Sequence, residues 1–336
     1  MKYLFTVFTI IIAVAFSSCK KAEFAGFNGF AQGTTYSIVY QSLKNSTPDS
    51  LKKEVEKILH DFDMSLSLYQ DSSVLSKVNR NEDIFVDPFF EEVFRKSALI
   101  SEMSGGAFDI TIGPLVRAWG FGPDDHKNFS ETKRDSLMKL VGMNRISLIN
   151  RKVVKADPAI SLDFNAIAQG YSVDVICSYF DDLGIENYLI EIGGEVRAEG
   201  TKNGNLWRIG IDRPEDNNII PGQSLQAIVR ITDRALATSG NYRKFYVEDG
   251  IKYSHTIDPK TGYPAKNRLL SATILANDCA TADGIATACM VMGHERSIEF
   301  INSNPQFSAY FVISGDDGSY QTWISENLKE FISEEQ

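Results

Sequence analysis

The chain has 336 residues, of which 43% are hydrophobic and 23% are charged, with 24 glycines and 10 prolines. These proportions are typical of a globular protein and exclude collagen-like, low-complexity and disordered chains. The formal charge of −10 at pH 7 argues against a nucleic-acid partner held through its phosphates. Beyond the N-terminus, no apolar run is long enough to cross a bilayer.

The N-terminus predicts an export signal. A single lysine precedes an apolar run from Leu4 to Phe16, which ends in two serines and Cys19. One positive charge, a short apolar stretch and small residues before a cleavage point are typical of a secretory signal. The cysteine after the serines resembles a bacterial lipoprotein signal, so we expect residues 1–18 to be removed and Cys19 to be lipidated. The alternative is cleavage nearby with Cys19 unmodified.

This interpretation divides the chain into a signal (1–18), a membrane-proximal tether (19–30) and one folded domain (31–336). It places the domain in a bacterial cell envelope, anchored by lipid to a membrane and facing the periplasm or another extracytoplasmic space. Three further cysteines, Cys177, Cys279 and Cys289, lie in apolar surroundings without a CxxC pair. We expect them to be buried thiols rather than a disulfide framework.

Strands and helices alternate along the rest of the chain. The first predicted strand covers 33–40, and a helix opening at Pro48 carries one apolar stripe. A second amphipathic helix runs from about Pro88 to Ser104 and ends at two glycines. We expect further strands at 153–164, 187–192, 207–212, 226–232, 270–276 and 309–314, helices near 131–141, 166–183, 279–293 and 320–332, and an exposed loop at 122–128. The pattern predicts a single α+β unit, in one or two lobes.

Common catalytic motifs are absent from the sequence, including Walker A, GxGxxG after a strand, HExxH and GxSxG, and the four histidines are scattered. Polar and glycine-containing segments instead interrupt apolar runs. In GGAFDITIGPL, Asp109 interrupts a strand-like stretch, and the alternative is a helix stop followed by a turn. In LDFNAIAQGYSVD, a strand delivers Asp163 to the start of a helix near Ala166, where a ligand or a simple cap would suit it.

Four more segments of this kind follow. They are EIGGEVRAEG, SGNYR, HTIDPKTGYP and DCATADGIATA. A plain turn has no need of His255, whose alternative role is to fix that turn. In a helix, Asp283 and Thr287 stand one turn apart and suit Mg2+, although such pairs are also common on solvated faces.

The identity and order of these segments resemble the ApbE family of FAD:protein FMN transferases, over roughly residues 30–295. The resemblance implies an ApbE-like (T-fold-like) α+β fold with mixed sheets and packed helices. It implies that Mg2+ is held by Asp283, Thr287 and the backbone carbonyl of Ala166. It also implies FAD contacts at Gln32, Tyr69, Ala107, Phe108, Asp109, Asp163, Gln169 and Ile257. Gln32 stands where Met is frequent and Gln169 where Lys or Glu is frequent, which bears on affinity more than on chemistry.

The implied reaction moves the FMN moiety of FAD to a Thr, sometimes Ser, hydroxyl of an exported or membrane flavoprotein, and AMP leaves. Breaking a pyrophosphate needs charge neutralisation, for which Mg2+ at Asp283 and Thr287 is suited. His255 is the only histidine within one of these segments, so it is our candidate for assisting proton transfer. The alternatives are an FAD pyrophosphatase giving FMN and AMP, a non-catalytic flavin-binding lipoprotein, and a scaffold lipoprotein.

Overall fold

The computed structural model describes residues 22–43, 47–121, 129–215, 222–241, 245–248, 251–254, 256–315, 317 and 319–334, and gives only the backbone of 245–248 and 251–254. The predicted signal, Cys19, the predicted loop at 122–128 and His255 therefore lie outside the described residues.

The main sheet has eight strands in the order β1-β2-β5-β6-β9-β12-β13-β14. Every neighbouring pair in it is antiparallel. Its strands are β1 (Phe24–Ala31), β2 (Thr34–Gln41), β5 (Tyr188–Ile192), β6 (Glu195–Glu199), β9 (Arg234–Gly240), β12 (Leu269–Ala276), β13 (Ser308–Ser314) and β14 (Tyr320–Ile324). The expected α+β class is confirmed, with antiparallel pairing throughout the described strands.

Three smaller sheets accompany it. A three-stranded sheet has the order β15-β8-β7, and β3 pairs with β4 as β10 does with β11. The strands are β3 (Ile146–Ile149), β4 (Lys152–Lys155), β7 (Trp207–Asp212), β8 (Leu225–Ile231), β10 (Phe245–Glu248), β11 (Ile251–Ser254) and β15 (Ile332–Glu334).

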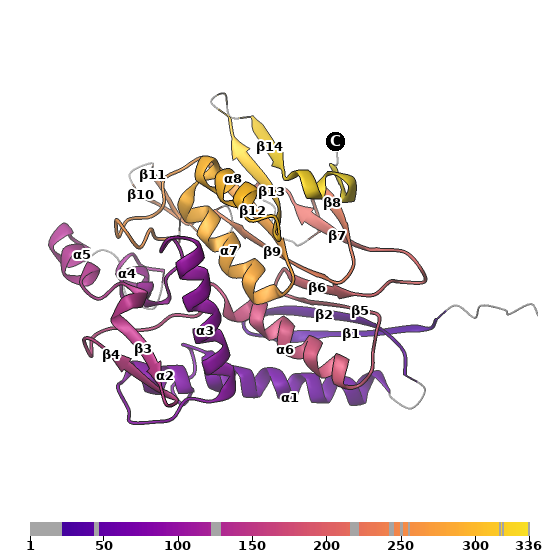
Figure 1. Cartoon of the computed structure of the whole chain (residues 1–336), viewed down its shortest axis with the longest axis horizontal. Helices are drawn as coiled ribbons and strands as arrows, with labels where there is room; N and C mark the ends of the chain where they lie inside the picture. Colours follow the sequence, from indigo (N-terminus) through magenta and orange to yellow (C-terminus); the bar gives the residue numbers. More distant parts are fainter. Residues whose placement is uncertain are drawn as a thin grey trace, which may run out of the picture.

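The helices lie mainly on one side of the main sheet (Figure 1). They are α1 (Pro48–Leu66), α2 (Val74–Asn79), α3 (Pro88–Met103), α4 (Gly113–Ala118), α5 (Glu131–Met138), α6 (Ala168–Asp182), α7 (Cys279–Met292) and α8 (His294–Ser303), with short 3-10 turns η1 (Ile110–Ile112), η3 (Met143–Arg145) and η4 (Glu326–Phe331). Helix α6 packs on β5 and β6, and α7 packs on β9 and β12, while α3 and α8 both contact α7. The two central helices therefore meet over the middle of the sheet.

Alternating side chains of the central strands fill a core on each face of the sheet. On β13, Phe311 packs in the core under the helices, whereas Tyr310 and Val312 pack against the smaller β15-β8-β7 sheet. That sheet contributes Trp207 and Val229 to the second core. Because successive strand residues point to opposite faces, a strand with both faces covered is apolar throughout. The burial of every residue from Ser308 to Ile313 follows from this arrangement.

The first predicted helix is confirmed, and its local chemistry accounts for its start. The Thr47 side chain accepts a hydrogen bond from the Ser50 N–H, and Pro48 occupies the first turn, where its missing N–H costs nothing. The expected stripe is buried at Leu51, Val55, Leu59 and Phe62, with Ile58 packed at its edge.

Three predicted elements are wrong. The stretch around Asp109 is not strand-like but forms η1 and α4, because the Asp109 carboxylate caps the Thr111 N–H. Of the predicted 153–164 strand, only residues 153–155 are paired, within β4, whereas 156–159 form a turn and 160–164 have no strand partner. The predicted 320–332 helix is β14, η4 and β15, because β13 offers the first part a strand partner.

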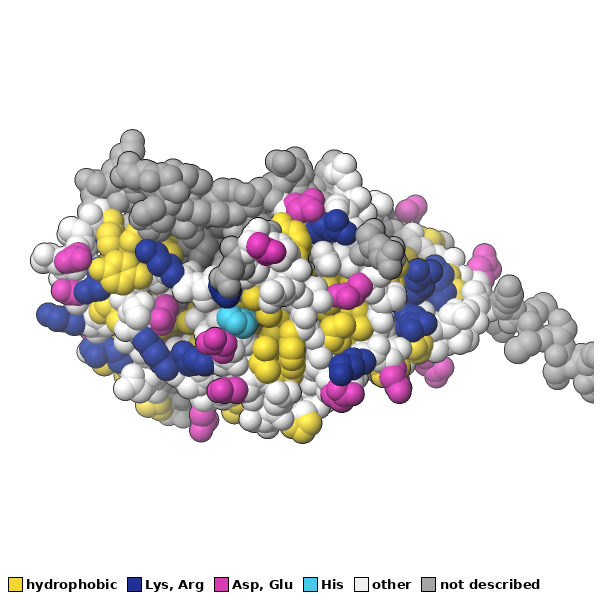
Figure 2. Space-filling model, turned by 90° about the horizontal axis from the view of Figure 1, so that it is seen from above, with side chains coloured by type: hydrophobic (Ala, Val, Ile, Leu, Met, Phe, Trp, Pro, Cys, Tyr) yellow, Lys and Arg dark blue, Asp and Glu magenta, His cyan; other side chains and the backbone are white. Residues whose placement is uncertain are grey.

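The N-terminal boundary also differs from the prediction. Strand β1 begins at Phe24, so most of the predicted 19–30 tether belongs to the main sheet. Strands β1 and β9 and helix α8 were not predicted. Among the described residues, no helix combines the length and apolar character that crossing a bilayer requires. On the face shown in Figure 2, acidic and basic side chains are interspersed with small apolar patches.

Candidate functional site

The turn between β1 and β2 presents the amide of Gln32. Gln32 and Gly33 have φ angles of 54° and 74°, the left-handed backbone of a tight two-residue hairpin turn. The Gln32 Oε1 accepts a hydrogen bond of 3.1 Å from the Ser172 hydroxyl of α6. The Gln32 Nε2 is buried and has no hydrogen-bond partner among the described residues. A buried amide donor without a partner is a group that a ligand acceptor would satisfy.

Gln169 lies in the same corner. The single proton of the Ser172 hydroxyl is shared with the Gln169 carbonyl at 2.7 Å, which links the start of α6 to the hairpin turn. A Cβ at Gly193 would stand 1.7 Å from the Gln169 Nε2, and the φ of 65° there further favours glycine. The structure therefore brings Gln32, Gln169 and the glycines between β5 and β6 together.

The segment after α3 supplies three predicted flavin residues. Ala107 and Phe108 are buried, and the Phe108 ring lies close to Gly284 of α7. The Asp109 carboxylate accepts hydrogen bonds from the Thr111 N–H and hydroxyl and from the Met143 N–H. Burial raises its pKa, and these bonds oppose that rise. The alternative considered for this segment, a helix stop followed by a turn, is thus present, and Asp109 caps the short η1 turn.

Asp163 connects the LDFNAIAQGYSVD segment to the GGAFDITIGPL segment by a backbone hydrogen bond. Its N–H donates 2.7 Å to the Ile110 carbonyl, and a Cβ at Gly113 would lie 3.3 Å from the Asp163 Cβ. One carboxylate oxygen accepts the Asn165 N–H in a local turn, whereas the N-cap of α6 is Ile167, so Asp163 is not the helix cap considered from the sequence. Burial raises the pKa of Asp163, and the positive charge of Arg117 opposes this. A buried carboxyl gains from every further hydrogen bond, because burial has removed part of its hydration.

The HTIDPKTGYP segment packs on the segment that begins GGAFDITIGPL. Ile257 is buried with Leu115 and Trp119, and the Trp119 indole N–H donates 2.8 Å to the Gly262 carbonyl. No described contact links Tyr69 to the other predicted residues. Its side chain is 79% exposed, which leaves the ring free to stack on a flat ligand.

Asp283 is the buried carboxylate of the DCATADGIATA segment. It is 7% exposed, and one oxygen accepts a 3.1 Å hydrogen bond from the Gly170 N–H of α6. Burial raises its pKa to about 7, the Gly170 hydrogen bond opposes the rise, and the Asp174 charge adds to it. Its other oxygen accepts no hydrogen bond from the described part of the chain. One turn later, the Thr287 hydroxyl lies 3.2 Å from the Ser239 hydroxyl of β9.

The Gly170 hydrogen bond also affects Ala166. In a regular helix the Gly170 N–H would donate to the Ala166 carbonyl, four residues earlier. Here that N–H is directed to Asp283, and α6 begins only at Ala168. The Ala166 carbonyl therefore lacks its helical partner, at the point where α6 meets α7.

The oxygen atoms of Asp283, Thr287 and Ala166 can be compared with the ligands that the predicted Mg2+ site requires. A carboxylate oxygen, a hydroxyl and a free carbonyl are donors that Mg2+ accepts, together with water and phosphate oxygens. Their chemistry fits the ion, and the set stays a prediction. Across the described residues, no three His, Cys, Asp or Glu side chains gather closely enough to hold a metal. The predicted set includes only one such side chain, because its other two ligands are a hydroxyl and a backbone carbonyl.

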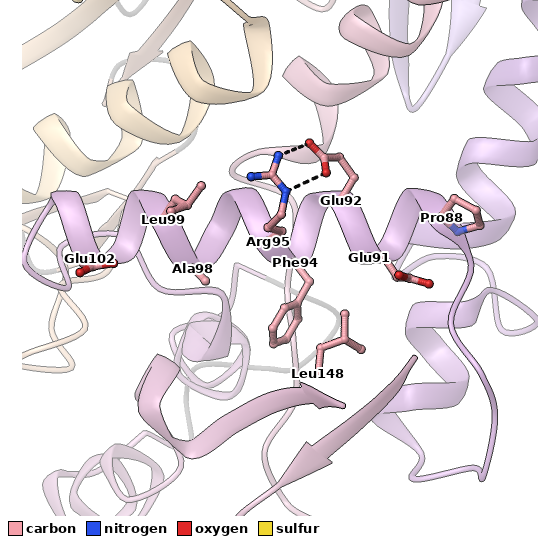
Figure 3. A pocket seen from close by; sticks show the side chains of 9 residues that line it. All are labelled: Pro88, Glu91, Glu92, Phe94, Arg95, Ala98, Leu99, Glu102 and Leu148. Atoms are coloured by element: carbon pink, nitrogen blue, oxygen red, sulfur yellow. Dashed lines mark hydrogen bonds and ion pairs between the residues drawn. The ribbon is translucent and has the colours of Figure 1, made fainter. Parts of the chain in front are cut away.

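A separate hollow of about 690 Å³ runs along the outer face of α3. Figure 3 shows Phe94 of α3 beside Leu148 of β3 and the Arg95–Glu92 ion pair on the other edge of the helix. None of the predicted flavin or metal residues lines it.

Sequence reasoning missed several residues of this region. Asn79 holds the Leu162 backbone with two hydrogen bonds, and no local pattern marks an asparagine at the end of a short helix for that task. Gly170 and Asp174 stand within the LDFNAIAQGYSVD segment but received no role. Their partners are on α7, more than 100 positions away.

The α+β fold of this chain is shared with known proteins. The ApbE family profile matches residues 32–311. The FAD:protein FMN transferase of Vibrio cholerae is 36% identical over 325 residues, covering 94% of this chain and 96% of the relative. That of Escherichia coli K12 is 30% identical over 323 residues, covering 93% and 90%.

Solved structures of ApbE proteins are also similar to this chain. The flavin transferase ApbE from Vibrio cholerae has a TM-score of 0.82 at 35% identity and covers 92% of this chain and 99% of that chain. The apo form of the Pseudomonas stutzeri flavinyl transferase ApbE has a TM-score of 0.83 at 32% identity, covering 93% and 98%. The chain belongs to the ApbE family.

Proposed function

We propose that this chain is an FAD:protein FMN transferase that uses Mg2+ to transfer FMN from FAD to a Thr or Ser hydroxyl of another protein and releases AMP. The transferase activity is supported by the names of relatives that align over nearly the whole chain. The observation that carries the site is the Gly170 N–H, which binds Asp283 and thereby frees the Ala166 carbonyl.

In this reaction the acceptor hydroxyl oxygen attacks the phosphorus atom that bears the riboflavin part of FAD. A phosphoester bond forms, the pyrophosphate P–O bond breaks, and AMP takes the bonding pair. Asp283, Thr287 and Ala166 would hold Mg2+, which when bound offsets negative charge on the pyrophosphate. The hydroxyl proton needs an acceptor, and His255 remains our candidate because histidine is the side chain that most often serves as a general base.

The protein groups around FAD bind and orient it. Gln32 offers an unpartnered amide N–H, and Tyr69 offers an exposed ring. Ala107, Phe108 and Ile257 contribute buried apolar surface on two segments that pack together. The Asp109 carboxylate holds the η1 region by accepting the Thr111 N–H, and the Asp163 backbone N–H donates to the Ile110 carbonyl of η1.

An Asp283→Ala substitution tests this function. The full chain is incubated with FAD, excess Mg2+ and co-expressed exported candidate acceptors, whose masses are measured while AMP is quantified by chromatography. We expect the variant to fold and to transfer no FMN, because one charged ligand is lost. Glu299→Ala on the exposed face of α8 is the control and should transfer at the wild-type rate.

The same assay separates the alternatives. Transfer by Asp283→Ala at the wild-type rate would refute the metal site. AMP release from the wild-type chain without any acceptor would indicate an FAD pyrophosphatase. FAD binding without release of AMP would indicate a non-catalytic flavin-binding lipoprotein. If the chain did not bind FAD, the scaffold lipoprotein would be the remaining alternative.

We also propose that Cys19 carries lipid and that the acceptor is an exported or membrane flavoprotein. The sequence supports this: a short apolar run ends in Ser-Ser-Cys. The enzyme would then face an extracytoplasmic space of a bacterial envelope, where its acceptors are also exposed.

A further inference from the structure

The N-terminus of α7 is capped from two directions. Its own N-cap residue, Asp278, accepts hydrogen bonds from the Thr281 N–H at 3.0 Å and the Thr281 hydroxyl at 2.9 Å, and binds Lys96 of α3 at 2.8 Å. Asp174, which belongs to α6, accepts the N–H groups of Cys279 at 2.7 Å and Ala280 at 2.9 Å. Three N–H groups that a helix start leaves without a partner are therefore bound by two carboxylates.

The second carboxylate is an unusual cap, because it comes from a neighbouring helix. An N-cap such as Asp278 stabilises its own helix wherever that helix lies. Asp174 can accept both N–H groups only when α7 keeps one position relative to α6. Burial raises the pKa of Asp174 to about 7, so the carboxylate is held in this place against its preference for water.

A second contact one turn away fixes the same pair of helices. The Gly170 N–H of α6 donates to Asp283 of α7. A Cβ at Gly170 would stand 2.4 Å from the Cys279 carbonyl oxygen and 2.8 Å from the Asp283 Cβ. The helices thus touch backbone to backbone at Gly170, and Asp174 holds the next turn.

These two contacts set the distance between groups on separate elements. Ala166 stands just before α6, whereas Asp283 and Thr287 stand on α7. We propose that Asp174 is a positioning residue, which fixes α7 against α6 so that these oxygens can share one Mg2+ ion. The inference rests on the proposed function and extends it to a residue that itself touches neither metal nor flavin.

A cap that only stabilises α7 would have a different effect. Its loss would lower the melting temperature and leave the metal affinity of the folded protein unchanged. Loss of a positioning residue weakens metal binding in protein that is still folded. Groups that orient metal ligands typically change metal affinity by about 10–100-fold when mutated.

The test uses Asp174→Asn in the full chain, purified in detergent. The amide keeps the shape but replaces one acceptor oxygen with a donor that faces a helix N–H. Calorimetric titration of MgCl2 in the presence of FAD should show a dissociation constant raised by about 10-fold or more. Without metal, amide hydrogen exchange at residues 279–283 should accelerate, because α7 is no longer held.

A matched control separates this effect from general destabilisation. Asp87 caps α3 and also accepts two hydrogen bonds, from the Phe90 N–H and the Ser65 hydroxyl. Asp87→Asn should lower the melting temperature while leaving Mg2+ affinity within about twofold of wild type, since no ligand-bearing helix pair depends on it. Should Asp174→Asn not fold, Gly170→Ala provides a second variant, which keeps every charge and forces the helices apart.

Each result decides the inference. Weaker Mg2+ binding in Asp174→Asn or Gly170→Ala, with Asp87→Asn unaffected, supports it. Wild-type affinity in a folded Asp174→Asn, or equal weakening in Asp87→Asn, overturns it. A wild-type chain that transfers FMN without binding Mg2+ would instead refute the proposed metal site, an outcome read from the wild type alone.

Discussion

One backbone N–H, that of Gly170, determines the surroundings of two predicted metal ligands. By binding Asp283 it withdraws the usual partner of the Ala166 carbonyl, just before the start of α6. A side chain at position 170 would collide with the Cys279 backbone. Glycine is therefore needed here for close approach of two helices, at a non-turn position where its helical propensity is poor.

Tyr69 provides a test of flavin stacking at the residue scale. Because its side chain is 79% exposed, Tyr69→Ala should leave the free energy of unfolding within about 0.5 kcal/mol of wild type. Loss of a stacking partner worth about 1 kcal/mol should raise the FAD dissociation constant about fivefold, measured by calorimetry. Phe85→Ala, at a 64% exposed ring outside the predicted site, is the control. Equal FAD affinity in all three proteins would contradict the assignment.

The buried thiols give a second test at this scale. Burial raises the pKa of Cys289 to about 12 and holds those of Cys177 and Cys279 well above their usual value. The thiolate is the reactive form, so the native protein should not react with a disulfide reagent at pH 8. In guanidinium, three of the four cysteines should react if Cys19 is lipidated, and a fourth equivalent would show that it is free. Rapid reaction of the native protein would show that these thiols are accessible.

At the scale of elements, the approach to Asp163 is held by a side chain instead of a strand. The Asn79 amide donates 2.9 Å to the Leu162 carbonyl and accepts 2.8 Å from the Leu162 N–H, which reproduces the two bonds of a β-bridge. This contact fixes the extended segment that ends at Asp163 and leads to Ala166. The end of α2 thus helps to position residues that follow it by more than 80 positions.

Asn79→Ala should therefore destabilise the fold. Two hydrogen bonds are lost and two backbone groups of a buried residue are left unpaired, so the free energy of unfolding should fall by about 2 kcal/mol in urea titrations. Asn205→Ala removes only contacts of 3.4 and 3.5 Å at an exposed turn and should change it by less than about 0.5 kcal/mol. An unchanged midpoint for Asn79→Ala would show that the segment holds itself.

At the scale of the whole molecule, the antiparallel sheet serves as a platform with two covered faces. The β15-β8-β7 sheet closes one face, and α6 and α7 close the other with the candidate site between them (Figure 1). The start of β1 leaves only residues 19–23 between the predicted lipid and the main sheet. A lipidated chain would therefore hold its domain close to the membrane.

Cys19→Ser tests the anchor. Without the cysteine, lipid attachment is impossible, and no described helix could replace it as a membrane span. We expect the variant to move from the membrane fraction to the soluble fraction after cell lysis, with its FMN transfer activity retained. Cys177→Ser, at a buried position, is the control and should stay with the membrane. Membrane partitioning of Cys19→Ser equal to that of wild type would refute lipid anchoring at this residue.

The sequence by itself determined the elements whose signal is local. The stripe of α1, the glycine stop after α3 and the alternating strand β2 were all predicted, because side-chain periodicity and caps act within a few residues. The polar segments that resemble the family could also be recognised by their order along the chain, and the comparisons confirm that family.

Only the tertiary structure decided what those segments contact. The 153–164 and 320–332 predictions failed because strand pairing and side-chain bridges depend on partners far along the chain, such as β13 and Asn79. The Asp109 and Asp163 carboxylates each accept an N–H two residues later, and Asp174 accepts hydrogen bonds from another helix that no spacing reveals. Hydrogen bonds between distant segments follow from packing, since only the folded chain brings a carboxylate of α6 to the first turn of α7.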